Sequence, residues 1–116
     1  MPRVLIVDDH ATFRATARRL LEAEGFDVVG EAEDGASALE AVARLRPEVV
    51  LLDVQLPDTD GFEVARCVGS NGFRPDIVLT SSRDASEFGD LVHTCGSRGF
   101  IPKAELSGGR LAALLE

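Results

Sequence analysis

The chain has 116 residues, of which 45% are hydrophobic and 28% charged, as expected for one folded domain with a single core. Acidic residues outnumber basic ones by 20 to 12, and the net charge of −8 argues against direct nucleic-acid binding, which needs a basic surface. No apolar run is long enough to cross a membrane, and the first, Val4–Val7, does not form a signal peptide. Two isolated cysteines, Cys67 and Cys95, favour a cytoplasmic protein over a disulfide-stabilised one.

Short apolar runs alternate with amphipathic stretches along the whole chain. Strands are predicted at 4–7, 26–30, 49–52, 77–79 and 100–101. Helices are predicted over about 11–24, over the stripe Ala38, Leu39, Val42 and Leu45 that ends before Pro47, over about 62–69 and 85–95, and after Ser107. Gly89 weakens the helix at 85–95, and residues 70–72 are predicted to form a turn.

Strands separated by single helices indicate repeated βαβ units. Such units have parallel strands, and their right-handed crossovers place helices on both faces of the sheet. We therefore predict an α/β domain, 1–116, with a five-stranded, doubly wound parallel sheet and five helices on both faces. The periodicity does not give the strand order.

Ligands of open parallel sheets bind beyond the carboxyl ends of the strands. The residues expected there are Asp8 and Asp9 after the first strand, Asp53 after the third, Thr80 to Ser82 after the fourth, and Lys103 after the fifth. Three carboxylates in one pocket repel one another, so a hard divalent cation such as Mg²⁺ is the expected guest. The lysine and the hydroxyls suit phosphoryl oxygens, so the set indicates phosphoryl transfer onto a carboxylate.

The sequence has no motif that would hold a nucleotide. Neither a Gly-x-x-x-x-Gly-Lys loop nor a Gly-x-Gly-x-x-Gly turn is present. The phosphoryl group must therefore come from another molecule. His10 and His93 are isolated, lack metal-ligand spacing, and are assigned no role.

Two segments resemble the receiver domain of two-component response regulators. Residues 4–10 are similar to the opening strand and acidic pair of that family, and residues 50–57 with Gly61 are similar to its phosphoacceptor segment. The spacing of 45 residues from Asp8 to Asp53 suits the family. The resemblance covers essentially the whole chain and implies a flavodoxin-like strand order of 2-1-3-4-5.

The resemblance assigns a role to each residue of the acidic edge. It implies that Asp53 accepts the phosphoryl group, that Asp9 binds Mg²⁺ directly with Asp8 acting mainly through water, and that the main-chain carbonyl of Gln55 is a further ligand. Thr80 and Lys103 would bind phosphoryl oxygens, and Phe100 would change rotamer as Thr80 moves. The implied partners are a sensor histidine kinase or histidine phosphotransfer protein and a downstream effector protein, and a phosphorylation-dependent homodimer stays open.

The sequence departs from the family pattern at two places. Counting from Pro75 favours Thr80 as the switch hydroxyl, whereas counting back from Lys103 favours Ser81. We prefer Thr80, with one extra residue in the following loop. Relatives often have a cis proline after the lysine, but here Ala104 follows Lys103, and non-proline cis bonds are costly.

The preferred function is a signalling switch that catalyses only its own phosphorylation and dephosphorylation. The first alternative is the receiver half of a DNA-binding transcriptional regulator whose helix-turn-helix domain lies outside this sequence. The second is a Mg²⁺-dependent phosphatase that uses Asp53 on outside substrates, against which the short loops argue. The third is a degenerate receiver, which the complete acidic, hydroxyl and lysine set opposes.

Overall fold

The computed structural model describes residues 2–69 and 74–115. The strands are β1 (Arg3–Val7), β2 (Asp27–Ala32), β3 (Val49–Asp53), β4 (Asp76–Ser81) and β5 (Gly99–Pro102), and the α-helices are α1 (Ala11–Ala23), α2 (Gly35–Leu45), α3 (Gly61–Gly69), α4 (Leu91–Thr94) and α5 (Gly108–Leu115). All strands are parallel, in the order β2-β1-β3-β4-β5, which confirms the predicted fold class and strand order. The turn predicted at 70–72 lies outside the described residues. Within the described ranges, no helix has the length and apolar character that a membrane crossing requires.

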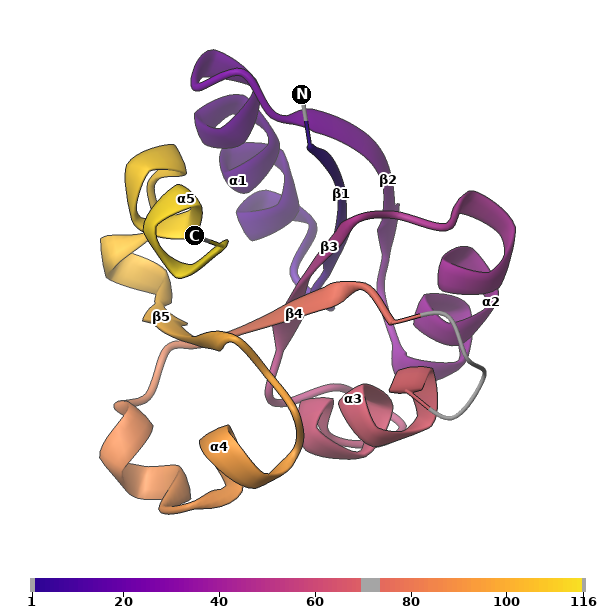
Figure 1. The fold of residues 1–116 in the computed structure, drawn as a ribbon, viewed down its shortest axis with the longest axis vertical. Coiled ribbons are helices and arrows are strands. Elements are labelled where there is room, and N and C mark those ends of the chain that lie inside the picture. The colour runs from indigo at the N-terminus through magenta and orange to yellow at the C-terminus, as the bar shows by residue number, and fades with distance from the viewer. Residues whose placement is uncertain (1, 70–73, 116) are drawn as a thin grey trace.

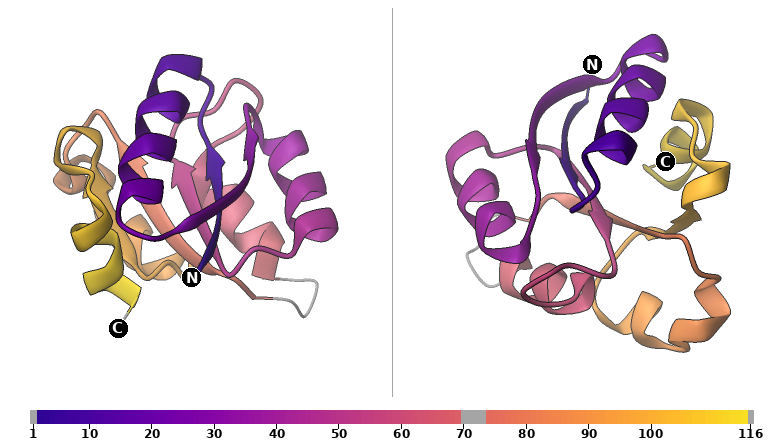
Figure 2. Two further views of the ribbon diagram at one scale, coloured as in Figure 1. Left: turned by 90° about the horizontal axis from the view of Figure 1, so that it is seen from above. Right: turned by 180° about the vertical axis from the view of Figure 1, so that it is seen from behind.

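Side chains alternate along each strand, so the sheet forms a separate core on each face. Leu5, Val50 and Leu79 pack on the face that α2, α3 and α4 cover, whereas Ile6 and Leu51 pack on the face that α1 and α5 cover. Figure 1 shows the sheet between these two groups of helices, and the right-hand view of Figure 2 shows α1 beside α5. Both faces are buried because both bear apolar side chains along the whole strand.

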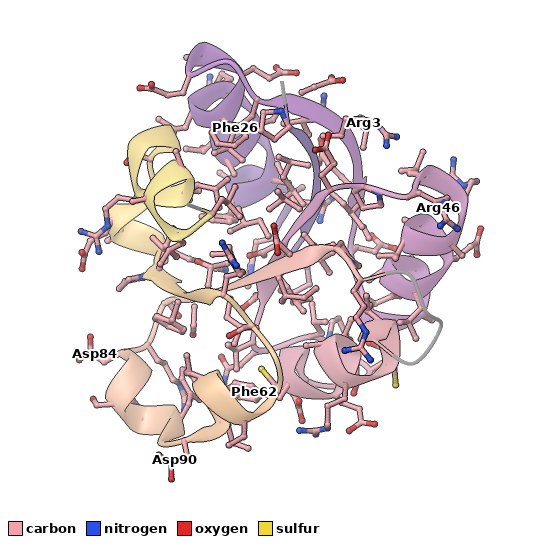
Figure 3. All side chains as sticks on the ribbon, in the orientation of Figure 1. Arg3, Phe26, Arg46, Phe62, Asp84 and Asp90 are labelled. Carbon is pink, nitrogen blue, oxygen red and sulfur yellow. The ribbon has the colours of Figure 1, made fainter. Side chains whose placement is uncertain are left out.

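The prediction of one continuous helix at 85–95 is wrong. Gly89 has a φ of 57°, a left-handed conformation that ends the first part of the segment. The segment therefore splits into a 3₁₀ turn at Ala85–Phe88 and α4, a single turn of four residues. Figure 3 shows Asp84 and Asp90, which flank the 3₁₀ turn, both directed away from the sheet.

An aromatic row holds the short α4 segment against the rest of the domain. The ring of Phe88 lies 5.6 Å from the ring of Phe62 on α3 and 5.9 Å from the ring of Phe100 on β5, measured between centroids. Each such pair contributes roughly 0.5–1.5 kcal/mol beyond the area that it buries. The segment thus depends on side-chain packing more than on helical hydrogen bonds.

Candidate functional site

Three of the predicted site residues meet at the carboxyl edge of the sheet. Lys103 Nζ lies 2.6 Å from Asp8 Oδ2 and 3.3 Å from Asp53 Oδ2. Asp8 is fully buried and Asp53 is 3% exposed. The ammonium group therefore bridges a carboxylate at the end of β1 and another at the end of β3.

The environment of Asp53 opposes its negative charge. Burial is the largest cause, followed by the charge of Asp8, and together they raise the pKa of Asp53 from 3.8 to about 6. The backbone N–H of Gln55, which donates to Asp53 Oδ1 at 3.2 Å, and the charge of Lys103 act in the opposite direction. A further positive charge beside Asp53 would therefore stabilise its ionised form.

Lys103 stays charged although it is mostly buried. Burial lowers its pKa, but the hydrogen bond to Asp8 and the charge of Asp53 outweigh burial and raise the pKa above its ordinary value of 10.5. Its Nζ also lies 4.6 Å from the centroid of the Phe13 ring on α1, within cation–π range. Lys103 begins a 3₁₀ turn at Lys103–Glu105, and every peptide bond in the described ranges is trans, including the one to Ala104.

A cavity of about 190 Å³ opens beside Asp53 and Asp9. It is lined by Asp9, His10, Asp53, Gln55, Leu56, Pro57, Ser82 and Lys103. Gln55 is exposed at its rim, and a single bridge to Asp60 holds its backbone across the loop. The cavity leaves room for a small anion next to Asp53.

The loop after β3 is fastened to the start of α2 by one carboxylate. Asp58 accepts hydrogen bonds from the backbone N–H groups of Gly35, at 2.8 Å, and Ala36, at 3.1 Å. These bonds, led by the one from Gly35, lower the pKa of Asp58. The loop that carries Gln55 is therefore held in place from α2.

His10 is a site residue that the sequence analysis missed. Its Nδ1 lies 3.1 Å from Asp8 Oδ1 and 3.0 Å from Asp9 Oδ1. Ligand atoms of Asp8, Asp9, His10 and Asp53 all lie within 4.8 Å of one another. This donor set fits a divalent cation, because it is rich in carboxylate oxygens and a cation would offset the repulsion between the three carboxylates.

Thr80 and Ser81 lie on opposite faces of β4. Thr80 pairs with Asp53 in the sheet register, is fully buried, and has a hydroxyl without a hydrogen-bond partner. Ser81 follows the face of Leu79, which pairs with Phe100, and its hydroxyl accepts from the backbone N–H of Arg83 at 3.1 Å. The structure thus places Thr80 beside Asp53 but Ser81, and not Thr80, on the face of Phe100.

Comparison with known proteins gives the family. Residues 4–115 match the model of the response regulator receiver domain. PdtaR, a transcriptional regulatory protein of Mycobacterium tuberculosis, is 35% identical over 114 residues, which cover 90% of this chain and 56% of PdtaR. The chain spans about half the length of the curated relatives that it matches first.

Solved structures agree with this match. A signal receiver domain from Mycobacterium tuberculosis named NarL has a TM-score of 0.87 at 35% identity, covering 98% of this chain and 96% of that one. A two-component response regulator of the LuxR family from Aurantimonas sp. SI85-9A1 has a TM-score of 0.86 at 30% identity, covering 99% of this chain and 86% of that one. The fold and site define a signal-transduction domain of two-component systems. The chain belongs to the response regulator receiver domain family.

Proposed function

We propose that Asp53 accepts a phosphoryl group from a phosphohistidine of a sensor histidine kinase or histidine phosphotransfer protein. The observation that carries this proposal is the position of Asp53, whose Oδ2 lies 3.3 Å from Lys103 Nζ at the wall of the cavity. A carboxylate oxygen of Asp53 would attack phosphorus, and the P–N bond of the donor would break. The products are an acyl phosphate and an imidazole that takes up a proton.

The surrounding side chains would hold the transferred group. Lys103, whose Nζ lies 3.3 Å from Asp53 Oδ2, is the proposed donor to one phosphoryl oxygen, and the unpartnered hydroxyl of Thr80 is the proposed second donor. Asp8 and Asp9 would hold a Mg²⁺ ion with Asp53 and the carbonyl of Gln55, and the bound ion would neutralise charge on the phosphoryl group. Loss of the group by water attack on phosphorus would return Asp53 to its starting state.

The partners follow from this chemistry. A donor must present a phosphohistidine to the cavity mouth, and an effector protein must recognise the surface that phosphorylation changes. The transcription-regulator names belong to relatives about twice as long, so we do not propose DNA binding for residues 1–116. We propose the cytoplasm as the compartment because the sequence has only two cysteines.

Intact mass after incubation with acetyl phosphate and Mg²⁺ tests the proposal. We expect a labile gain of one phosphoryl group on the wild type and none on Asp53→Asn. Asp27→Asn is the matched control, because Asp27 is an exposed carboxylate at the opposite edge of the sheet and should leave labelling intact. Labelling of Asp53→Asn would identify another acceptor. A folded wild type that neither acetyl phosphate nor a phosphohistidine protein labels would overturn the proposal.

A further inference from the structure

We propose that Asp58 is a positioning residue for phosphoryl transfer, because it holds the loop after β3 against α2 and so fixes the main-chain carbonyl of Gln55. Asp58 is exposed, lies outside the lining of the cavity beside Asp53, and takes no part in the chemistry proposed above. The inference rests on the proposed function, but it concerns α2, a helix that contributes no residue to the cavity lining.

The loop after β3 folds into a closed turn, and Asp58 lies near its tip. The N–H of Leu56 donates to the carbonyl of Thr59 at 3.2 Å, and a single antiparallel bridge joins Gln55 to Asp60. These two pairs lie one on each side of the peptide groups around Gln55. A change in the position of Asp58 would therefore be passed to the carbonyl of Gln55 through the turn.

The side chain of Asp58 anchors the tip of this turn to the start of α2. Its carboxylate accepts from the N–H of Gly35 at 2.8 Å and from that of Ala36 at 3.1 Å, across 23 and 22 positions of sequence. N–H groups in the first turn of a helix have no partner within the helix, and the partial positive charge there favours a carboxylate. The N-cap of α2, Asp34, serves a different donor, the N–H of Ser37 at 2.7 Å.

Close packing accompanies these hydrogen bonds. Gly35 has no side chain, and a Cβ at this position would clash with Thr59 Cγ2 and lie 3.2 Å from Asp58 Oδ1. It would also lie 3.3 Å from Val64 Cγ2 on α3. The start of α2 thus fits directly against the loop and the helix that follows it, so Asp58 holds two packed surfaces together.

A fixed loop would favour binding at Asp53. A carbonyl that is already in place does not have to be ordered when an ion binds, so the affinity is higher than for a mobile loop. Coupling of this kind is reciprocal: if the contact of Asp58 with α2 raises the affinity for Mg²⁺, then Mg²⁺ must stabilise that contact to the same extent.

Mg²⁺ affinity, measured by calorimetric titration without any phosphoryl donor, tests the inference. We expect Asp58→Ala to weaken Mg²⁺ binding about tenfold, since loss of groups that orient metal ligands typically costs 10–100-fold. Asp58→Asn, which keeps one acceptor oxygen, should lose less. At saturating Mg²⁺ the rate of labelling by acetyl phosphate should return to within about twofold of the wild type, because Asp58 contacts no reacting atom.

Asp34→Ala is the matched control. It removes a carboxylate that caps the same end of α2, but that carboxylate does not contact the loop after β3 through the bond to Ser37. We expect Asp34→Ala to lower the melting temperature, as Asp58→Ala does, and to leave Mg²⁺ affinity unchanged. Amide hydrogen exchange gives a second readout: Mg²⁺ should slow exchange at Gly35 and Ala36 in the wild type but not in Asp58→Ala.

Thermal unfolding of each variant is measured first, and Asp58→Asn serves if Asp58→Ala does not fold. Equal Mg²⁺ affinity in the wild type and the Asp58 variants would overturn the inference, and so would equal losses in Asp58→Ala and Asp34→Ala, or a wild type that does not bind Mg²⁺. A failure of the Asp53 proposal would show separately, as missing phosphoryl mass on a chain whose Mg²⁺ affinity still depends on Asp58.

Discussion

Lys103 and Asp8 form an ion pair of 2.6 Å between groups that are 16% and 0% exposed at their side chains. The pair joins the ends of β5 and β1, although β4 and β3 lie between these strands in the sheet. Lys103 also lies 3.3 Å from Asp53, so one ammonium group offsets two carboxylates that come from different strands. Transfer of a phosphoryl group to Asp53 would replace the carboxylate charge beside Lys103 with the charge of the phosphoryl oxygens.

Removal of the ammonium group should destabilise the fold more than removal of an exposed cation. We expect Lys103→Met to lower the free energy of unfolding by about 3 kcal/mol at neutral pH, because breaking a buried ion pair leaves an uncompensated charge. Urea unfolding checks this value, and millimolar Mg²⁺ should restore part of the loss. Arg110→Met is the control: its pair with Glu105 is 2.8 Å long but about half exposed, so its loss should cost less than about 1 kcal/mol. Equal losses in both variants would contradict the prediction.

The raised pKa of Asp53 should appear as a pH-dependent gain of stability in Asp53→Asn. Asp53 titrates at about 6 in the folded protein and near 3.8 when unfolded, so the folded state holds its proton more tightly between these values. The contribution of Asp53 to the free energy of unfolding of the wild type is therefore fully present below pH 3.8 and is lost as the pH rises through 6. At about 1.4 kcal/mol per pKa unit, we expect Asp53→Asn to be more stable by about 2–3 kcal/mol at pH 7.5 and by little near pH 4.

Asp58 should change the pH dependence of stability in the direction opposite to Asp53. The pKa of Asp58 is lowered by the N–H groups of Gly35 and Ala36, so its contribution is present at neutral pH and is lost on acidification. Asp58→Asn should therefore be less stable than the wild type at pH 7.5, whereas Asp53→Asn should be more stable. Denaturant unfolding at several pH values measures both. A pH-independent difference for Asp53→Asn would show that the burial and charge repulsion that raise the pKa of Asp53 are not its cause.

Much of the fold could be predicted because its strands bear apolar side chains on both faces. Residues 4–7 and 49–52 cannot form a half-exposed element, and their place between amphipathic stretches indicates parallel strands. The segment 85–95 was not predictable in the same way. Its apolar spacing is compatible with a helix, and Gly89 indicates a weak point, but the spacing does not show that Gly89 takes a left-handed φ of 57° and divides the segment.

The site was predictable where a residue directly follows a strand. Asp8, Asp53 and Lys103 meet because parallel strands bring their carboxyl ends to one edge. His10 was missed because its contacts depend on the conformation before α1, which no ligand spacing in the sequence reveals. The choice between Thr80 and Ser81 was ambiguous because neighbouring strand residues point to opposite faces, so a difference of one residue in loop length changes the face.

The two hydroxyls of β4 should respond differently to substitution. Thr80→Val should raise the free energy of unfolding by about 1 kcal/mol, because the buried Thr80 hydroxyl has no partner and its desolvation is uncompensated. Ser81→Ala should lower it by about 1 kcal/mol, because Ser81 accepts a hydrogen bond from the N–H of Arg83. Urea unfolding of the two variants checks both signs.

The same variants decide which hydroxyl binds the phosphoryl group. Beryllofluoride with Mg²⁺ is a phosphoryl mimic, and its binding should raise the melting temperature of the wild type. We expect Thr80→Val to lose most of this shift and Ser81→Ala to keep it. The reverse result would assign the phosphoryl contact to Ser81, the hydroxyl on the face of Phe100.

Gly61 should not tolerate a side chain, because it packs against the backbone of the phosphoacceptor. A Cβ at Gly61 would lie 2.5 Å from the carbonyl oxygen of Asp53 and 3.0 Å from Val54 Cα. Backbone atoms cannot move aside as a flexible side chain can, so Gly61→Ala should lower the free energy of unfolding by about 1–3 kcal/mol. It should also weaken the stabilisation by Mg²⁺, since Asp53 would be displaced.

Gly109→Ala is the matched control for this substitution. A Cβ at Gly109 would meet only Ser107 Oγ, at 4.0 Å, and Gly109 lies in the first turn of α5. Alanine in a helix is favoured over glycine by up to about 1 kcal/mol, so Gly109→Ala should unfold at the same or higher denaturant concentration as the wild type. Denaturant unfolding with and without Mg²⁺ compares the two variants. A Gly61→Ala protein with wild-type stability and an unchanged Mg²⁺ response would show that the contact between α3 and Asp53 is not close enough to position the carboxylate.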